Sequence, residues 1–418
     1  MQLLTAQNVV SFAVTDPGAI PYKVENNQLY LTDSSLDYLV SGFTVTSFKQ
    51  SYPLANSYTG SNAEYLQSIY EIEVPGSPQT VVQYLEQNAS SYYTDVMGVD
   101  NINPLTESIV NEVIIEETSM NCYSDDPLNV SDGWWHLEMM CLPELFCDQM
   151  VDPSIKVAII DIGYKNIFSN PDVASSILGV EDEFTTSSSI FGSGASNHGL
   201  ATALAVGAIQ DNGIGITGSG AGVKLLLYET DRFGFNQNEM IEDYLEAHRE
   251  GAKIIVSTVH LLGCPPPQAQ LNYFQAAINL MNELGVVVLY PASNGSSNGC
   301  DGGTNIAAGV PGWENERIRN GYMYPASLPG CISVSGITEG KSVFSGNQAC
   351  QANESTCSYG NVTGYHTHND KVDVVGPAWC VLNGIVDNCN GGGTITRFSS
   401  GNSISTPLMG GVVAQLLT

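Results

Sequence analysis

The sequence predicts an α/β protein in which a mostly parallel sheet carries helices on both faces, preceded by a small α+β domain. Two observations lead to this prediction. From residue 155 onward, apolar strand-like runs alternate with helical patterns, which implies crossover connections between parallel strands. The first 120 or so residues contain no cysteine and combine short strand-like runs with amphipathic segments. The length of 418 residues allows two or three domains.

The N-terminal domain is expected over residues 1–120. FTVTSF at 43–48 and SIYEIEV at 68–74 have strand character. SPQTVVQYLEQN at 77–88 has apolar residues at helical spacing behind a serine that could cap a helix. With a last apolar strand, EVIIEE at 112–117, these segments suggest the β-α-β-β-α-β order of a ferredoxin-like domain. A generic α+β appendage is the alternative.

Residues 121–418 are expected to form the parallel sheet. Apolar runs predict its strands, and longer amphipathic patterns predict its helices. The expected strands are KVAIID (156–161), VKLLLY (223–228), KIIVSTV (253–259), VVVLYP (286–291) and CISVSGI (331–337), and the expected helices begin at His198 or cover 238–251 and 272–285. The stretch from about 340 to 395 is rich in loop residues and contains four cysteines, so we expect a disulfide-tied surface insertion there.

Three side chains stand at element boundaries where they could form a charge-relay set. Asp161 closes an apolar run, His198 opens a helix of small residues, and Ser403 opens another helix behind a glycine. A serine hydroxyl needs an imidazole base within hydrogen-bond reach, and the imidazole needs a carboxylate to orient it. Asp161 and Asn294 both follow predicted strands, and active residues of parallel sheets collect at the carboxyl ends of strands. Taken singly, each residue has an ordinary reading as a turn, cap or structural residue.

The segments around these residues resemble the motifs of subtilisin-like serine peptidases. They read DIG at 161–163, HGLATAL at 198–204 and GNSISTP at 401–407, and YPASNG at 290–295 is similar to the oxyanion segment of that family. The resemblance implies that Ser403 attacks the scissile carbonyl, His198 transfers the proton and Asp161 orients His198. It also implies that Asn294 and the Ser403 amide bind the oxyanion of the tetrahedral intermediate. The expected activity is that of a serine endopeptidase.

Several positions depart from the family pattern. Ile162 stands where the family has Thr, Leu200 and Ala201 stand where it has Thr-His, and Asn402 replaces the Thr before the serine. None of these changes removes a proton-transfer group, although Asn402 lacks a hydroxyl thought to assist the oxyanion. A catalytically weak or inactive family member that acts as a binding or scaffold protein is therefore the alternative. A small-molecule binder built on an open parallel sheet is a third reading.

The N-terminal domain resembles the inhibitory propeptide of the same family, which would make the chain a self-processing zymogen. The segment at 124–140 is similar to the start of many mature enzymes of the family, so we expect maturation between about 117 and 125. No Lys or Arg occurs between Gln50 and Ile155, which argues against cleavage by a basic-site convertase. Self-cleavage, with the propeptide bound in cis, is the favoured interpretation.

The resemblance also places the substrate as an added strand between two edge segments. These segments would lie around Phe235 and around His260, Leu261, Leu262 and Gly263. Leu262 stands where the family usually has glycine, which would narrow the primary pocket and favour small or medium apolar P1 residues. Alternatively, Leu261 and Leu262 are simply core residues.

The loop IQDNGIGITG at 209–218 resembles a calcium loop of the family. Calcium takes six to eight oxygen ligands, and carboxylates from distant segments suit it. The resemblance implies a structural Ca²⁺ held by the side chains of Asn212, Asp172 and Asp126 and by the carbonyls of Gln210, Ile214 and Ile216. An ordinary Asn-Gly turn is the alternative. No organic cofactor is expected.

Composition narrows the class of partner and the compartment. The formal charge of −30 arises from 43 acidic and only 13 basic residues, which argues against nucleic acid and anionic lipid as partners. No apolar stretch is long enough to span a membrane, and the first residues do not read as a signal peptide. We expect a monomer that acts on polypeptides.

The cysteines point to an extracellular protein. All ten occur at or after Cys122, and no CxxC pair is present, which fits disulfides better than a zinc site. Local spacing suggests pairing of Cys141 with Cys147, Cys350 with Cys357, and Cys380 with Cys389, although spacing alone does not determine connectivity. Secretion is therefore the expected localisation.

Overall fold

A computed structural model gives the structure of the chain, which forms two compact units. One unit comprises Met1–Leu105, Asp231–Glu246 and Pro265–Leu284, and the other comprises the remaining residues. The structure describes residues 8–99, 126, 135–148, 151–164, 166–180, 198–230, 237–261, 265–294, 321–338, 361–362, 367, 369–378, 381–387, 394–399 and 401–418.

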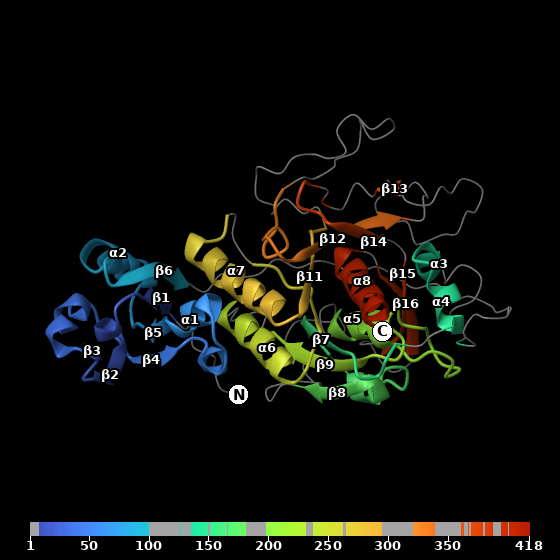
Figure 1. Ribbon diagram of the computed structural model, residues 1–418, viewed down its shortest axis with the longest axis horizontal. Helices are drawn as coiled ribbons and strands as arrows, with labels where there is room; N and C mark the ends of the chain where they lie inside the picture. The colour runs from blue at the N-terminus through green and yellow to red at the C-terminus, as the bar shows by residue number, and fades with distance from the viewer. Residues whose placement is uncertain are drawn as a thin grey trace. The chain divides into compact units, whose positions relative to one another are not determined.

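The first unit contains an antiparallel sheet of four strands in the order β4-β5-β1-β6 (Figure 1). β1 lies between its two neighbours, with Val10 opposite Ile72 of β5 and opposite Gly98 of β6. A second, two-stranded sheet pairs β2 with β3. The bounds are β1 Val9–Val14, β2 Pro21–Glu25, β3 Gln28–Leu31, β4 Ser47–Gln50, α1 Ser61–Gln67, β5 Ile69–Glu73, α2 Pro78–Asn88 and β6 Tyr93–Val99. Short 3-10 helices lie over Pro17–Ala19, Ser34–Val40 and Pro53–Ser57.

The N-terminal prediction is right in class and wrong in detail. The helix over 77–88 is present as α2, but the strand predicted at 43–48 begins only at Ser47. Its first residues have another partner, because the Val45 N–H donates to the carbonyl of Asn27 in the turn of the β2–β3 hairpin at 3.0 Å. The strand predicted at 112–117 lies outside the described residues, and β6 is the strand that follows α2.

The second unit is built on a parallel sheet in the order β8-β9-β7-β10-β11-β12-β14, with the short β13 antiparallel to β12. This confirms the predicted fold class. Every residue of β10 is buried, as expected for a central strand of a sheet covered on both faces. The bounds are β7 Lys156–Asp161, β8 Ile177–Val180, β9 Lys224–Glu229, β10 Ile254–Ser257, β11 Val287–Pro291, β12 Ile332–Thr338, β13 Asn361–Val362 and β14 Val374–Pro377.

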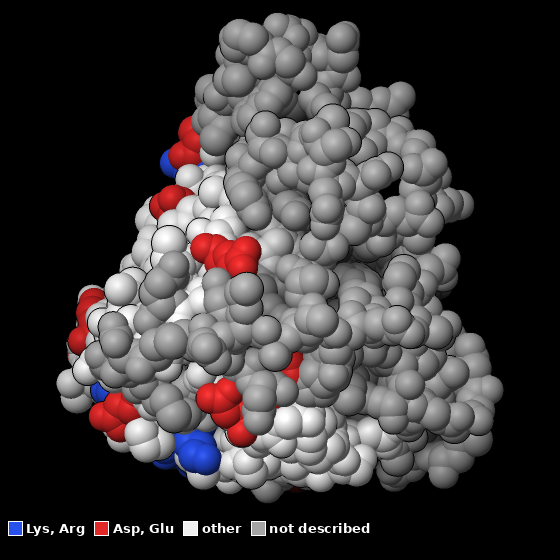
Figure 2. Space-filling model, turned by 90° about the vertical axis from the view of Figure 1, so that its right-hand side faces the viewer, with Lys and Arg blue, Asp and Glu red and all other residues white. Residues whose placement is uncertain are grey.

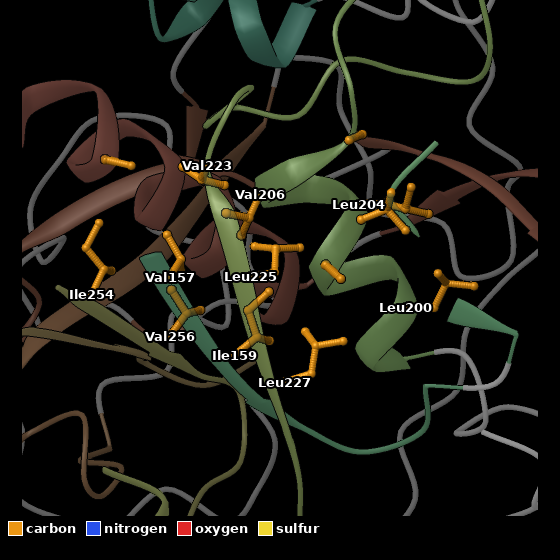
Figure 3. Packing of buried hydrophobic residues seen from close by; sticks show 14 of the residues in the cluster. Val157, Ile159, Leu200, Leu204, Val206, Val223, Leu225, Leu227, Ile254 and Val256 are labelled. Carbon is orange, nitrogen blue, oxygen red and sulfur yellow. The ribbon is translucent and has the colours of Figure 1, made fainter. Parts of the chain in front are cut away.

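Two helices of the second unit, α5 (His198–Gly207) and α8 (Asn402–Leu417), pack against each other and against this sheet. α5 contacts β7 and β9, and α8 contacts β10, β11, β12 and β14. The core between them is aliphatic, with Leu204 of α5 among the side chains that pack over β7 and β9 (Figure 3). Glycines bring α8 close to its neighbours, because a Cβ at Gly410 would lie 2.5 Å from the Val256 side chain. The remaining elements of this unit are α3 Trp135–Met139, α4 Leu142–Asp148, β15 Val381–Asp387, β16 Thr394–Ser399 and 3-10 turns at Ile167–Ser169 and Ala174–Ser176.

Two further helices, α6 (Gln237–Arg249) and α7 (Gln268–Glu283), form the chain connections from β9 to β10 and from β10 to β11. Most of α6 and all of α7 belong to the first unit, where α7 packs on α1 and β6. Asp95 joins these elements. Its carboxylate accepts hydrogen bonds from Tyr65 and Asn272 at 2.7 and 2.6 Å, and its carbonyl accepts one from Tyr273 at 2.6 Å.

The stretch predicted as an insertion, 340–395, is only partly one. β14 lies inside it and is a strand of the main sheet, with Val374 opposite Val334 of β12. β15 and the first two residues of β16 also fall within it, and the two strands form a hairpin. The other residues of the stretch are described in part, and Cys350, Cys357, Cys380 and Cys389 lie outside the described residues.

The predicted pairing of Cys141 with Cys147 is not found, because Cys141 is a free thiol in the part of the chain that the structure describes. α4 begins directly after Cys141 and includes position 147.

The distribution of charged side chains and the lengths of the helices agree with what the composition predicts. On the face shown in Figure 2, acidic side chains are dispersed over the described part of the surface, and basic ones are few. Among the described residues, no helix has both the length and the apolar character needed to cross a bilayer.

Candidate active site

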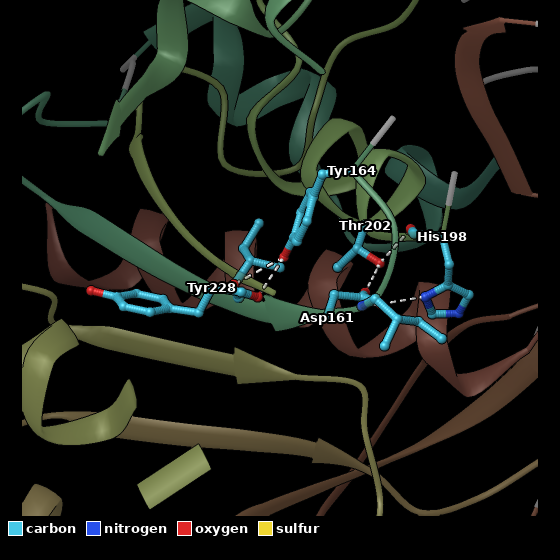
Figure 4. Close-up of polar contacts among 7 residues, drawn as sticks. Asp161, Tyr164, His198, Thr202 and Tyr228 are labelled. Carbon is cyan, nitrogen blue, oxygen red and sulfur yellow. Dashed lines mark hydrogen bonds and ion pairs between the residues drawn. The ribbon is translucent and has the colours of Figure 1, made fainter. Parts of the chain in front are cut away.

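The carboxylate of Asp161 is the centre of a compact hydrogen-bond network at the end of β7 (Figure 4). Its Oδ1 lies 2.6 Å from Nδ1 of His198 and also accepts the Ile162 N–H at 2.6 Å. Its Oδ2 accepts the hydroxyl of Thr202 at 2.6 Å. The Asp161 side chain is fully buried, whereas 26% of the His198 side chain is exposed. The imidazole is thus held through Nδ1 by a buried acceptor and keeps an accessible edge.

The start of α5 is held against the end of β7 by backbone and ring contacts. The Gly199 N–H donates to the carbonyl of Ile162 at 2.9 Å. Tyr164 stands beside Gly199, and its hydroxyl donates to the Ile159 carbonyl at 3.0 Å. A Cβ at position 199 would lie 2.7 Å from the Tyr164 ring, a contact that real side chains do not make. Glycine after His198 therefore allows the histidine to approach the aspartate.

The start of α8 is held by Asn294, which follows β11. Its Oδ1 accepts the Asn402 N–H at 2.6 Å, and the side chain of Asn402 donates to the Ser293 carbonyl at 2.7 Å. Gly401 precedes the helix with a φ of 137°, a conformation open to glycine. Because Oδ1 of Asn294 is occupied by a backbone donor, the Nδ2 end is the one that can donate to another group.

The structure brings one pair of the predicted catalytic residues into direct contact and places Asn294 beside the start of the helix that carries Ser403. Asp161 and His198 are joined directly, and Asn294 is joined to the residue that precedes Ser403. Ser403 is half-buried as the second residue of α8, and α8 packs against the helix that begins at His198. In this arrangement the serine and the histidine lie near the starts of neighbouring helices.

Sequence reasoning missed Thr202 and Tyr164. Thr202 had a usable signal, because it lies four residues after His198 on the same helix, and such residues share one helix face. Tyr164 had none, since its role depends on a ring contact with Gly199 that only the packing reveals.

Of the predicted substrate segment, Phe235, Leu262 and Gly263 lie outside the described residues. His260 follows β10, between the strand that ends at Asp161 and the strand that precedes Asn294. Burial lowers the pKa of His260 to about 4, so this imidazole is neutral at pH 7. Leu261 is buried, and its N–H donates to the Tyr324 carbonyl at 2.8 Å, which fits the alternative reading of Leu261 as a core residue.

The residues predicted to bind calcium are brought together, since the loop after α5 wraps two buried carboxylates. Both oxygens of Asp126 accept backbone N–H groups, from Asn212 and Gly213 on one oxygen and from Asp211 on the other. Asp126 also accepts the Thr217 hydroxyl at 2.7 Å. The carboxylate of Asp126 is therefore satisfied by four protein donors.

The second carboxylate, that of Asp172, also accepts hydrogen bonds from the loop. It accepts the Asn212 side-chain amide and the Ile216 N–H, each at 3.0 Å, and the Asn212 oxygen accepts the Ile214 N–H at 2.7 Å. Burial raises the pKa of Asp172 to about 7, and the nearby Asp126 adds to this shift, whereas the loop donors oppose it.

In this structure, protein donors surround the side chains that were predicted to bind calcium. Calcium needs six to eight oxygen ligands directed at one point, but here N–H and O–H donors surround the carboxylates. Among the described residues, no group of three His, Cys, Asp or Glu side chains could hold a metal ion.

Comparison with known proteins supports the fold. The chain resembles the epidermin leader peptide processing serine protease EpiP from Staphylococcus aureus, with a TM-score of 0.56 and 12% identity over 99% of this chain and 88% of that chain. It also resembles MycP1 from the ESX-1 type VII secretion system, with a TM-score of 0.50 and 16% identity over 74% of this chain and 78% of that chain. At these identities the likeness concerns the fold alone.

Sequence comparison identifies the family. No curated protein matches the chain. Residues 152–418 match the family model described as the subtilase family, and this segment contains Asp161, His198, Asn294 and Ser403. Because the segment makes up well over half of the sequence, the chain belongs to the subtilase family of serine proteases.

Proposed function

We propose that this chain is a serine endopeptidase that hydrolyses peptide bonds through Ser403, His198 and Asp161. The observation that carries the proposal is the 2.6 Å contact between the buried Asp161 carboxylate and Nδ1 of the partly exposed His198. A carboxylate at Nδ1 fixes the tautomer in which Nε2 is the base, and it stabilises the imidazolium that forms when a serine proton is taken up.

The acyl-transfer chemistry would proceed as follows. Ser403 attacks the scissile carbonyl while His198 takes the hydroxyl proton, and His198 then returns that proton to the leaving amine. Asn294 Nδ2 and the Ser403 N–H would donate to the oxyanion of the tetrahedral intermediate. The hydrogen bond from the Asn402 N–H to Asn294 Oδ1 favours this amide orientation. Water then releases the acyl group by the same steps in reverse.

Labelling with a fluorophosphonate tests the proposal. The matured protein, read by intact mass, is expected to gain a single adduct, and Ser403→Ala and His198→Ala should gain none. Asp161→Asn should label slowly, because its amide would favour the wrong imidazole tautomer. Wild-type protein that stays unlabelled after confirmed removal of the N-terminal domain would point to a family member that binds polypeptides without cutting them.

We further propose that the chain is a secreted zymogen that removes its own N-terminal domain. Support comes from the lack of Lys and Arg between Gln50 and Ile155 and from ten cysteines, all at or after Cys122. The expected cut lies between about 117 and 125. Mass analysis of purified Ser403→Ala tests this step, since the variant should stay full length. Trimming of that variant at the wild-type position would show that another protease makes the cut.

A further inference from the structure

We propose that Thr202 is a positioning residue that fixes the Asp161 carboxylate for its interaction with His198. The inference deepens the proposed function, on which its kinetic part rests. It rests on the third donor to the Asp161 carboxylate, the hydroxyl of Thr202. Thr202 lies one turn after His198 on α5 (Figure 4).

The three donors divide unequally between the two carboxylate oxygens. His198 Nδ1 and the Ile162 N–H both contact Oδ1, at 2.6 Å each. Among the described residues, Thr202 alone hydrogen-bonds Oδ2, also at 2.6 Å. Two donors at one oxygen leave the carboxylate able to turn about its Cβ–Cγ bond, and a donor at the other oxygen stops that rotation. The lone pair of Oδ1 is then held in line with the imidazole nitrogen.

Burial makes this hydrogen bond hard to replace. The Asp161 side chain is fully buried, and Thr202 is 1% exposed, so bulk water does not reach the pair. A buried carboxylate that loses a donor keeps the desolvation cost of its charge. The remaining donors on Oδ1 would then meet a carboxylate that is more basic and less firmly oriented.

A purely helical role for the hydroxyl is the competing explanation. Threonines inside helices often donate to the carbonyl four residues back, and the His198 carbonyl lies 3.1 Å from Thr202 Oγ1. A hydroxyl has one proton, however, and the carboxylate is closer by 0.5 Å, the difference between 3.1 and 2.6 Å. Charged acceptors form the shorter and stronger hydrogen bonds, so the proton belongs to Asp161.

The kinetic test compares Thr202→Val, which removes the hydroxyl, with Thr202→Ser, which keeps it. We expect Thr202→Val to lower kcat roughly 10- to 100-fold, the range for a lost hydrogen bond to a charged group, with KM nearly unchanged. The acid limb of the kcat/KM profile should move to higher pH, because a more basic carboxylate holds the proton on His198 more firmly. Thr202→Ser should restore both values.

The control variant is Ser176→Ala. Ser176 is buried and donates to the carbonyl of Gly207, the last residue of α5, at 2.9 Å. Its loss should reduce thermal stability without moving the pH profile. The proposal would be overturned if Thr202→Val left the pH profile unshifted. It would also be overturned if Ser176→Ala shifted the profile as far as Thr202→Val does.

A second measurement does not need activity. In the Ser403→Ala background, the His198 Nδ1 proton should give a downfield NMR resonance, because it lies in a short hydrogen bond to a carboxylate. Thr202→Val should shift this resonance, because both the basicity and the orientation of the Asp161 carboxylate change, and Thr202→Ser should not. A shifted resonance in a protein that fails to label would leave the positioning role standing and reject the proposed function. An unchanged resonance in Thr202→Val would reject the positioning role.

Discussion

Asn294 has two contributions that mutation can separate. Its Oδ1 accepts the Asn402 N–H and so holds the start of α8, whereas its Nδ2 is the end that would serve the oxyanion. Aspartate keeps an acceptor for Asn402 and lacks the amide donor. Alanine removes both.

We expect Asn294→Asp and Asn294→Ala each to lower kcat by about 100- to 1,000-fold with a small change in KM. Only the alanine variant should also lose thermal stability, since it leaves the Asn402 N–H without its acceptor. Steady-state kinetics and thermal unfolding measure the two effects. Full activity in Asn294→Asp would show that the side-chain amide does not stabilise the transition state.

At the residue scale, the sequence predicts those candidate functional positions whose signal is local. Asp161, His198 and Asn294 sit where an apolar run ends or a small-residue helix begins, so motif and context agree. Thr202 acts only because α5 packs its first turns against the end of β7, and Tyr164 acts only because its ring meets Gly199. Contacts of this kind depend on the tertiary structure, which no local pattern contains.

At the level of elements, α8 depends on glycines that allow close approach. A Cβ at Gly411 would lie 2.0 Å from Ser219 Oγ and 2.5 Å from the Gly220 nitrogen, and the second of these atoms belongs to the backbone. The helix would have to move away from that loop to admit a methyl group.

We therefore expect Gly411→Ala to destabilise the protein by about 1–3 kcal/mol, the usual cost of overpacking. Gly76→Ala is the matched control, because a Cβ at that exposed glycine would meet nothing within 4 Å. Thermal unfolding of both variants measures the difference. Equal stability would mean that α8 adjusts without cost.

The loop after α5 gives a prediction about metal removal. Because its two carboxylates are satisfied by protein donors, we expect EDTA to leave the melting temperature unchanged. Asp126→Ala should lower the free energy of unfolding by more than about 2 kcal/mol, since several N–H groups would lose a buried acceptor. Thr217→Val, which removes one of the four donors, should have a smaller effect. A drop in melting temperature with EDTA that Ca²⁺ reverses would show that the loop binds calcium.

The elements that the sequence missed are those defined by pairing. β14 is four residues long, and its strand character comes from hydrogen bonds to β12. β4 starts later than its alternating pattern suggests, because the Val45 N–H is used by the β2–β3 turn. Long apolar runs such as β7 and β9 needed no such information, because their composition alone favours a buried strand.

For the molecule as a whole, the first unit carries a buried acid that should make its stability depend on pH. Glu71 on β5 is 4% exposed, and Lys49 of β4 lies 3.3 Å from its carboxylate. Burial raises the pKa of Glu71, and the ion pair with Lys49 only partly offsets this effect. The folded unit thus binds the proton more tightly than the unfolded chain does.

The raised pKa of Glu71 in the folded unit determines how stability changes with pH. The favourable contribution of protonated Glu71 is present below its unfolded pKa of about 4.3 and is lost as the pH rises through the higher folded value. We expect Glu71→Gln to remove this part of the pH dependence, and Lys49→Met to strengthen it by raising the folded pKa further. Hydrogen exchange of the β5 amides at several pH values in the full-length protein provides the measurement. A wild-type profile in Glu71→Gln would contradict the assignment.

The composition of the first unit from three segments has a consequence for synthesis on the ribosome. The N-terminal sheet is complete once β6 ends at Val99, but its partner helix α7 ends at Glu283. The intervening 283 − 99 = 184 residues take roughly 10–40 s to make at about 5–20 residues per second. During that interval Tyr65 and Asp95 lack the helix that later binds Asp95 through Asn272 and Tyr273. The contacts of Asp95 with Asn272 and Tyr273 can therefore form only after α7 has been made, so the first unit is completed long after its N-terminal sheet has been synthesised.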